Sequence, residues 1–184
     1  MANNDVYNSY LIVRTLPKLI VDHLYKNNEE FWKLLKYSQS TVNVENVTKS
    51  EKNAMIATSS SGDLSAKQIL FDIYTTDATI TANAQVRISV LDVKPTNRTN
   101  GQLLLLIQCI VSNKESMIRT DVCPVESKAF AIAQELIKSL NGTDLEGLNG
   151  CLWLDEKQDR RTGIHKTTYG NNFSGYDLIF GAQV

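Results

Sequence analysis

The sequence has no excess of either charge and no long apolar run. It contains 19 Lys and Arg against 20 Asp and Glu, so its 184 residues carry a formal net charge of -1. Proteins that bind nucleic acid or anionic membranes usually carry a basic excess, which is missing here. Apolar runs such as 103–107 are strand-sized, far short of the roughly 20 residues of a membrane helix. The N-terminus lacks the basic and apolar regions of a secretory signal. We therefore expect a cytosolic protein without membrane contact.

Cysteine and histidine are also scarce. The three cysteines, Cys109, Cys123 and Cys151, are far apart and form no C-x-x-C pair, and only His23 and His165 are available to join them. A structural zinc site needs four ligands, usually supplied as two local pairs. We therefore predict no metal site and no cofactor, and interpret the cysteines as small apolar side chains.

The short motifs that mark common active sites are absent. There is no G-x-S-x-G nucleophile elbow, and the glycines at 147 and 150 are not followed by the lysine of a phosphate loop. Cys123 precedes Pro124 at a predicted helix start, where the pKa of a thiol can be lowered. No base partner is identifiable for it, which favours an inert cysteine. We predict no catalytic residue and no enzyme activity.

The first 37 residues have helical periodicity and form a predicted N-terminal helical segment. Apolar residues recur every three or four positions over 6–24, and Pro17 inside this pattern predicts a kink or a restart. A second helix is predicted over 28–37, with Asn28 as its N-cap. Trp32 lies off the apolar stripe of that helix. It is interpreted either as covering a partner or as a surface aromatic on its own domain.

Residues 38–184 are predicted to form an α+β core domain. The region 38–65 has loop composition with a brief helix over 50–55 capped by Ser50. Alternating apolar residues predict strands over 68–75 and 84–93, the second forming a hairpin through Asn100-Gly101 with the wholly apolar strand 103–111. An amphipathic helix is expected to open at 121–124 and to end at Asn141-Gly142.

Two further strands are predicted, over 151–155 and 175–181, separated by a long polar loop over 156–174. The predicted fold is a mainly antiparallel sheet packed against one amphipathic helix. Within the loop, acidic and basic residues are mixed, which favours a solvated or interfacial loop over a strip that contacts DNA. The candidate subunit-interface residues are Trp32, Asp159, Arg160, Arg161, His165 and Lys166.

Three segments carry a resemblance to a known family: Leu34-Leu35-Lys36-Tyr37, the glycine-rich segment 145–150, and Gly175-Tyr176-Asp177-Leu178-Ile179-Phe180. Their order resembles bacteriophage head-tail connector (neck) proteins with a tail-terminator-like fold. The resemblance implies a structural virion protein in a closed ring of about six or twelve copies. Such a ring would link portal or adaptor to tail or other neck proteins, surround the DNA passage with transient DNA contact, and assemble in the host cytoplasm. The alternative is a small monomeric accessory module, either an assembly chaperone or a nucleic-acid adaptor.

Overall fold

The protein has an α+β fold, as the sequence predicts. The computed structural model describes residues 4–71, 80–95, 100–154 and 162–184. The helices are α1 (Asn4–Asn27), α2 (Glu29–Lys36), α3 (Lys49–Met55), the 3₁₀ turn η2 (Asn113–Glu115) and α4 (Lys128–Leu140). The strands are β1 (Ile69–Leu70), β2 (Ala84–Pro95), β3 (Gly101–Ser112), β4 (Met117–Ile118), β5 (Glu126–Ser127), β6 (Gly163–Tyr169) and β7 (Phe173–Gln183).

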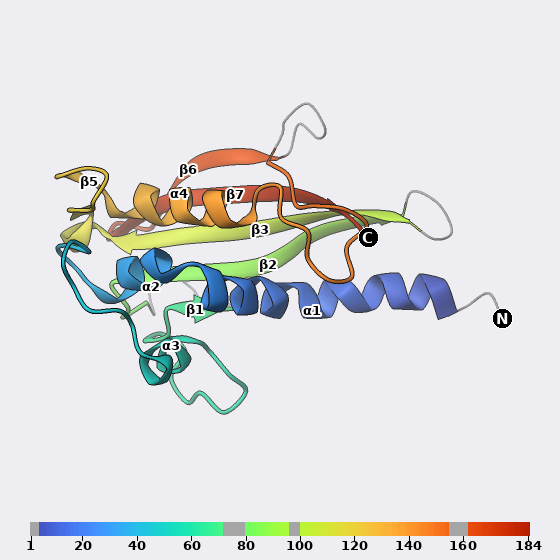
Figure 1. The fold of residues 1–184 in the computed structure, drawn as a ribbon, viewed down its shortest axis with the longest axis horizontal. Coiled ribbons are helices and arrows are strands. Elements are labelled where there is room, and N and C mark those ends of the chain that lie inside the picture. Colours follow the sequence, from blue (N-terminus) through green and yellow to red (C-terminus); the bar gives the residue numbers. More distant parts are fainter. Residues whose placement is uncertain (1–3, 72–79, 96–99, 155–161) are drawn as a thin grey trace.

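The main sheet has the strand order β1-β2-β3-β7-β6 (Figure 1). Only the β1–β2 pair is parallel, and the other pairs are antiparallel. The β2–β3 hairpin runs from the Ala84–Val111 pair to the Pro95–Gly101 pair, which confirms the predicted hairpin. A bulge interrupts this register at Leu91, the extra residue between Val90 and Asp92.

One face of the sheet packs against α1, α2 and α4. These helices share a single hydrophobic cluster with the sheet, to which α1 contributes Leu16, Ile20 and Leu24. Because this cluster also contains Leu136 of α4 and Leu105 of β3, the N-terminal helical segment shares the core of the sheet. The interior of β3 is buried on both of its faces, as its apolar sequence predicts.

The helix ends follow local capping chemistry. α1 continues through Pro17 as one helix, so the predicted restart there is wrong. Asn28 caps α2 as predicted, because its Oδ1 accepts a hydrogen bond from the Phe31 backbone N–H at 2.8 Å. The cap of α3 is Thr48 rather than the predicted Ser50. Thr48 forms a capping box with Glu51, in which each side chain accepts a hydrogen bond from the backbone N–H of the other residue.

The start of α4 corrects the prediction that this helix opens at 121–124. Its N-cap is Ser127, and residues 119–125 instead connect β4 to β5. The β4–β5 pairing joins Met117 to Ser127, so the backbone before Lys128 is extended rather than helical. At the other end, Gly142 adopts a φ of 80°, which agrees with the predicted glycine stop.

The C-terminal region differs most from the prediction. The predicted loop 156–174 contains β6, which pairs with β7 from the Gly163–Ile179 pair to the Tyr169–Phe173 pair. The predicted strand 151–155 is limited to isolated bridges, including the pair of Trp153 with Gly181. Trp153 and Gly163 therefore pair with β7 only two positions apart, at Gly181 and Ile179.

Close packing explains Gly175, the glycine that opens one of the resemblance segments. It pairs with Ile110 in the middle of the sheet. A Cβ atom at this position would lie 1.8 Å from the carbonyl oxygen of Cys109, so no other residue fits without a backbone shift.

Candidate functional site

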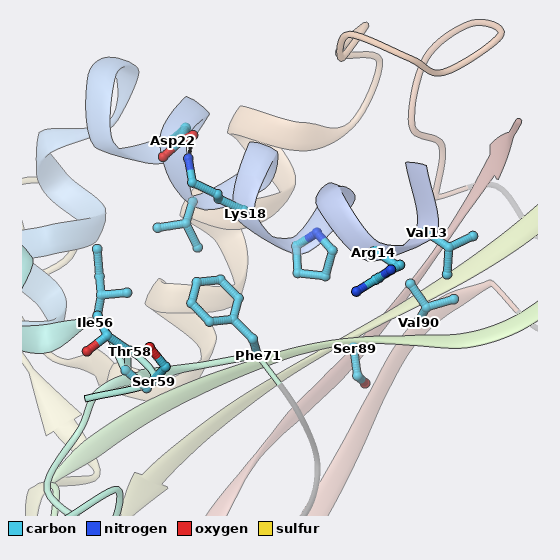
Figure 2. Close-up of a pocket in the computed structure, with 13 residues that line it drawn as sticks. Val13, Arg14, Lys18, Asp22, Ile56, Thr58, Ser59, Phe71, Ser89 and Val90 are labelled. Carbon is cyan, nitrogen blue, oxygen red and sulfur yellow. Dashed lines mark hydrogen bonds and ion pairs between the residues drawn. The ribbon is translucent and has the colours of Figure 1, made fainter. Parts of the chain in front are cut away.

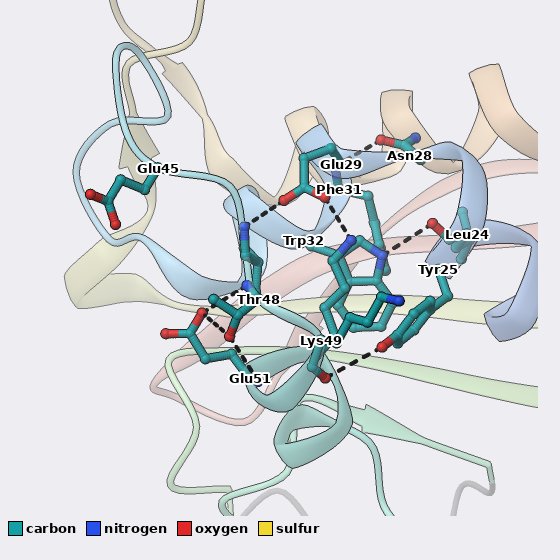
Figure 3. Close-up of polar contacts among 12 residues, drawn as sticks. Leu24, Tyr25, Asn28, Glu29, Phe31, Trp32, Glu45, Thr48, Lys49 and Glu51 are labelled. Carbon is teal, nitrogen blue, oxygen red and sulfur yellow. Dashed lines mark hydrogen bonds and ion pairs between the residues drawn. The ribbon is translucent and has the colours of Figure 1, made fainter.

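Trp32, a predicted interface residue, is completely buried, so its prediction is corrected. Its relative exposure is 0%, and its indole Nε1 donates a hydrogen bond to the Leu24 carbonyl oxygen at 3.1 Å (Figure 3). Its ring makes edge-on contacts with Tyr25 and Phe31, with centroids 5.7 and 5.5 Å away. Trp32 thus belongs to the core and offers no surface to a partner. Trp32 lies off the apolar stripe of α2, but it is buried because α1 and α3 cover that side of the helix.

A buried lysine occupies the aromatic corner around Trp32. The Nζ of Lys52 lies 5.3 Å from the Tyr25 ring centroid and 5.5 Å from the Trp32 centroid, and it pairs with Glu29 Oε2 at 2.6 Å. Glu29 Oε1 accepts a hydrogen bond from the Val47 backbone N–H. An aromatic corner of this kind can bind a ligand cation. Here the chain's own ammonium fills it, so the site joins α3 to the α1–α2 corner.

The neighbouring Glu51 has a strongly shifted pKa. Its carboxylate accepts a hydrogen bond from Lys36 Nζ at 2.7 Å and further bonds from the backbone and side chain of Thr48. These bonds, led by the one from Lys36, lower the pKa of Glu51 to about 2. The carboxylate is therefore ionised at physiological pH. It holds the first turn of α3 through the capping box with Thr48 and joins it to α2 through Lys36.

The other predicted interface residues divide into two groups. His165 and Lys166 lie on β6, one of the two edge strands of the sheet, and both are exposed. Ile164 beside them is also exposed. Asp159, Arg160 and Arg161 lie outside the described residues.

A polar row that was not predicted from the sequence crosses the sheet on the face away from the helices. Arg87, Gln108, Asp177 and His165 are in register on β2, β3, β7 and β6. Directly paired residues on neighbouring strands lie on the same face. Arg87 and Gln108 are both buried. The signal available in the sequence was the polar alternation at 85, 87 and 89.

Asp177 is the centre of this row. Its carboxylate accepts hydrogen bonds from the Tyr169 hydroxyl, from Gln108 Nε2 at 3.2 Å and from Thr167 Oγ1 at 3.1 Å. Burial, together with the bond to Asp177, raises the pKa of the Tyr169 hydroxyl above its ordinary value. Because these bonds occupy the carboxylate, the arrangement holds β3, β7 and β6 together rather than presenting a free base.

A groove of about 830 Å³ lies between α1 and the outer edge of β2 (Figure 2). Its apolar lining includes Val13 and Pro17 of α1, Phe71 after β1, and Val90. Figure 2 shows Phe71 and Val90 pointing towards α1, with Arg14 beside them. This volume lies within the range of about 300–1,000 Å³ that is typical of ligand pockets. The groove has no signature in the sequence, because its walls come from segments that are distant in the chain.

The cysteines have three different environments. Cys109 is buried, and burial raises the pKa of its thiol. Cys123 lies in the β4–β5 connection, not at the start of α4, which corrects the helix-terminus interpretation. Cys151 is exposed. Within residues 4–71, 80–95, 100–154 and 162–184, no three His, Cys, Asp or Glu side chains lie close enough to hold a metal ion. In the same ranges, no helix is long and apolar enough to span a bilayer.

The comparison with known proteins places the sheet together with α2, α3 and α4 in one family. Residues 28–181 match the YomW family, from the N-cap of α2 almost to the end of β7. The chain belongs to the YomW family. The family takes its name from a gene in the phage SPBeta region of Bacillus, which makes this a phage-associated protein. No curated protein has significant similarity to the chain. The YomW match does not include α1, although α1 packs into the same hydrophobic cluster.

Proposed function

We propose that this YomW-family chain is a structural virion protein that forms an oligomeric ring in the phage neck, as a connector or tail terminator. The ring would contain about six or twelve copies, join the portal or its adaptor to the tail, and surround the DNA passage. Such a protein acts by assembly and has no catalytic role. It would assemble in the host cytoplasm and remain in the virion.

The observation that carries the proposal is the open outer edge of β6 in a phage-associated chain. An edge strand presents unpaired backbone N–H and C=O groups to another chain. Within the described part of the molecule, no strand pairs with β6 on the side away from β7. His165 and Lys166 lie on this edge, with Ile164 beside them.

The charged segment between Trp153 and Gly163 supports the same interpretation. It contains Asp159, Arg160 and Arg161, and the described residues on either side of it, Trp153 and Gly163, both pair with β7. Charges of both signs at a subunit boundary select partners and orientation more than they add affinity. In the proposed ring, these residues and Lys166 contact the neighbouring subunit.

The decisive test is the mass of the assembled protein. We expect light scattering and native mass spectrometry of the full chain to give a closed oligomer, either alone or after mixing with the portal ring. Negative-stain images of the mixture should show an added ring on the portal axis. A monomer that never docks would contradict the proposal, and steeply salt-dependent DNA binding by such a monomer would favour a nucleic-acid adaptor instead.

Charge reversal tests the part played by β6. Lys166→Glu should reduce the ring fraction, because it places a carboxylate at the proposed boundary. Lys114→Glu on η2 is the matched control, since it reverses another exposed lysine outside the β6 edge. Equal effects of the two substitutions would remove β6 from the proposed interface.

A further inference from the structure

The most exposed apolar side chains of the described residues gather on one small hairpin. Val122 is 89% exposed, Val125 is 64% exposed and Met117 is 53% exposed. No other large apolar residue in residues 11–71, 80–94, 100–154 and 162–184 is as exposed as these three. All three lie on β4 or in the connection between β4 and β5. Clustered exposed apolar groups mark interaction sites, whereas isolated ones need no explanation.

The backbone of this hairpin is held firmly while its apolar side chains face solvent. The Thr120 hydroxyl oxygen accepts hydrogen bonds from the backbone N–H groups of Val122 and Cys123, at 3.3 and 3.2 Å. The Thr120 N–H donates to the Cys123 carbonyl oxygen at 2.9 Å. Arg119, at the start of the connection, ties the hairpin to the segment after α2 through backbone hydrogen bonds with Gln39 and Thr41. The tip is therefore pre-organised, which lowers the entropic cost of docking.

The groove between α1 and β2 is a second apolar surface, in a different part of the molecule. The β4–β5 hairpin lies at the end of the molecule away from the N-terminus of α1, whereas the groove lies along α1 (Figures 1 and 2). The groove is lined by Val13, Pro17, Phe71 and Val90. Its volume of about 830 Å³ leaves room for two valine side chains and the turn that carries them.

The charges at the two surfaces are complementary. Arg14 at the groove and Asp121 at the hairpin tip are both exposed. Neither has an ion-pair partner within the part of the chain that the structure describes. Lys18, the other cation that lines the groove, is paired with Asp22 at 2.5 Å. An approaching carboxylate would thus find Arg14 available.

We propose that the hairpin tip of one copy inserts into the α1–β2 groove of the next copy, with Val122 and Val125 in the groove and Asp121 beside Arg14. The contact joins two different surfaces, so it is heterologous, and a heterologous contact closes into a ring when its rotation closes. It rests on the proposed ring function, and it adds a second contact that is separate from the β6 edge.

The first test combines an apolar disruption with a charge exchange. Val122→Asp should reduce self-association at least tenfold without changing the fold, because the side chain is exposed in the isolated chain. Leu64→Asp, at an exposed leucine away from the hairpin and the groove lining, is the matched control and should have no effect. Arg14→Glu and Asp121→Arg should each weaken association, and the double variant should restore it. Circular dichroism of each variant checks that folding is intact.

The second test uses two proteins in a Cys123→Ser, Cys151→Ser background, each with one introduced cysteine besides the buried Cys109. One carries Val122→Cys at the hairpin tip, and the other carries Ser59→Cys at the groove. Each protein alone should stay uncrosslinked on mild oxidation, whereas an equimolar mixture should give the mixed dimer. Dimers of Val122→Cys alone, without mixed dimers, would overturn the heterologous contact.

The outcomes separate this inference from the proposed function. A ring that forms normally with Val122→Asp and gives no mixed dimer overturns the hairpin–groove contact and leaves the neck role standing. Mixed dimers from a protein that never docks on the portal support the contact and count against the neck role. A wild-type protein that stays monomeric both alone and in the presence of the portal overturns the hairpin–groove contact and the neck role together.

Discussion

The α1–α2–α3 corner and the β4–β5 hairpin are both well supplied with hydrogen bonds, but their large side chains are placed in opposite ways. In the corner, Trp32 is 0% exposed and Lys52 lies between its ring, the Tyr25 ring and the Glu29 carboxylate. In the hairpin, hydrogen bonds fix the backbone while Val122 faces solvent. The difference indicates that the corner residues serve the stability of the chain, whereas the hairpin tip is free to serve a contact.

The largest expected effect is loss of the aromatic corner. Trp32→Ala should reduce the free energy of unfolding by about 4 kcal/mol, because it removes a fully buried side chain and leaves a cavity. Urea denaturation of the variant measures the loss. Trp32→Phe, which keeps most of the ring, should cost less than the alanine variant. A loss below about 1 kcal/mol for Trp32→Ala would mean that the corner does not carry the stability inferred here.

A second buried lysine, Lys128, tests whether an ion pair that has no aromatic rings beside it also affects the stability of the fold. Lys128 is 1% exposed, its Nζ lies 3.5 Å from Glu115 Oε2, and burial lowers its pKa. Glu115→Gln should destabilise the chain by about 3 kcal/mol, because it leaves a buried ammonium without its carboxylate. Lys128→Met, measured in the same denaturation series, should be close to neutral. A Lys128→Met variant as unstable as Glu115→Gln would show that the ion pair itself contributes net stability.

The dependence of stability on acid pH tests the contribution of the Glu51 carboxylate, which caps α3. The pKa of Glu51 is about 2 in the folded chain, below its ordinary value of 4.5. The unfolded chain therefore binds more protons between these values, so the stabilisation is present above pH 4.5 and is lost as the pH falls towards 2. The difference in melting temperature between wild type and Glu51→Gln should shrink over that window. A difference in melting temperature that stays constant with pH would argue that the hydrogen bonds from Lys36 and Thr48 do not lower the pKa of Glu51.

The smallest effect on stability is expected at the hairpin tip. Val122→Ser should change the free energy of unfolding by less than about 0.5 kcal/mol, because the side chain is already exposed. The same denaturation assay, run at a concentration where the chain is monomeric, provides the comparison with Trp32→Ala. A clear loss for Val122→Ser would mean that the hairpin, like the corner, is part of the fold.

Elements with a strong local signal were predictable. The β2–β3 hairpin follows from alternating apolar residues and a turn at Asn100-Gly101, and the Asn28 cap follows from its position before Glu29 and Glu30. β6 was missed because its residues are mostly polar, and its stability comes from backbone pairing with β7 rather than from an apolar pattern. Of the candidate interface residues, Trp32 was misplaced, since burial by α1 and α3 leaves no periodic signal within α2.

The sequence by itself determined the α+β class, the two-sided burial of β3 and the capping of α2, because each depends on neighbouring residues whose spacing matches one secondary structure. Only the tertiary structure decided that Trp32 encloses Lys52, that Asp177 joins three strands, and that α1 and β2 enclose a groove. These features join residues that are distant in the chain. Periodicity predicts which side of an element is buried, but not which distant element covers it.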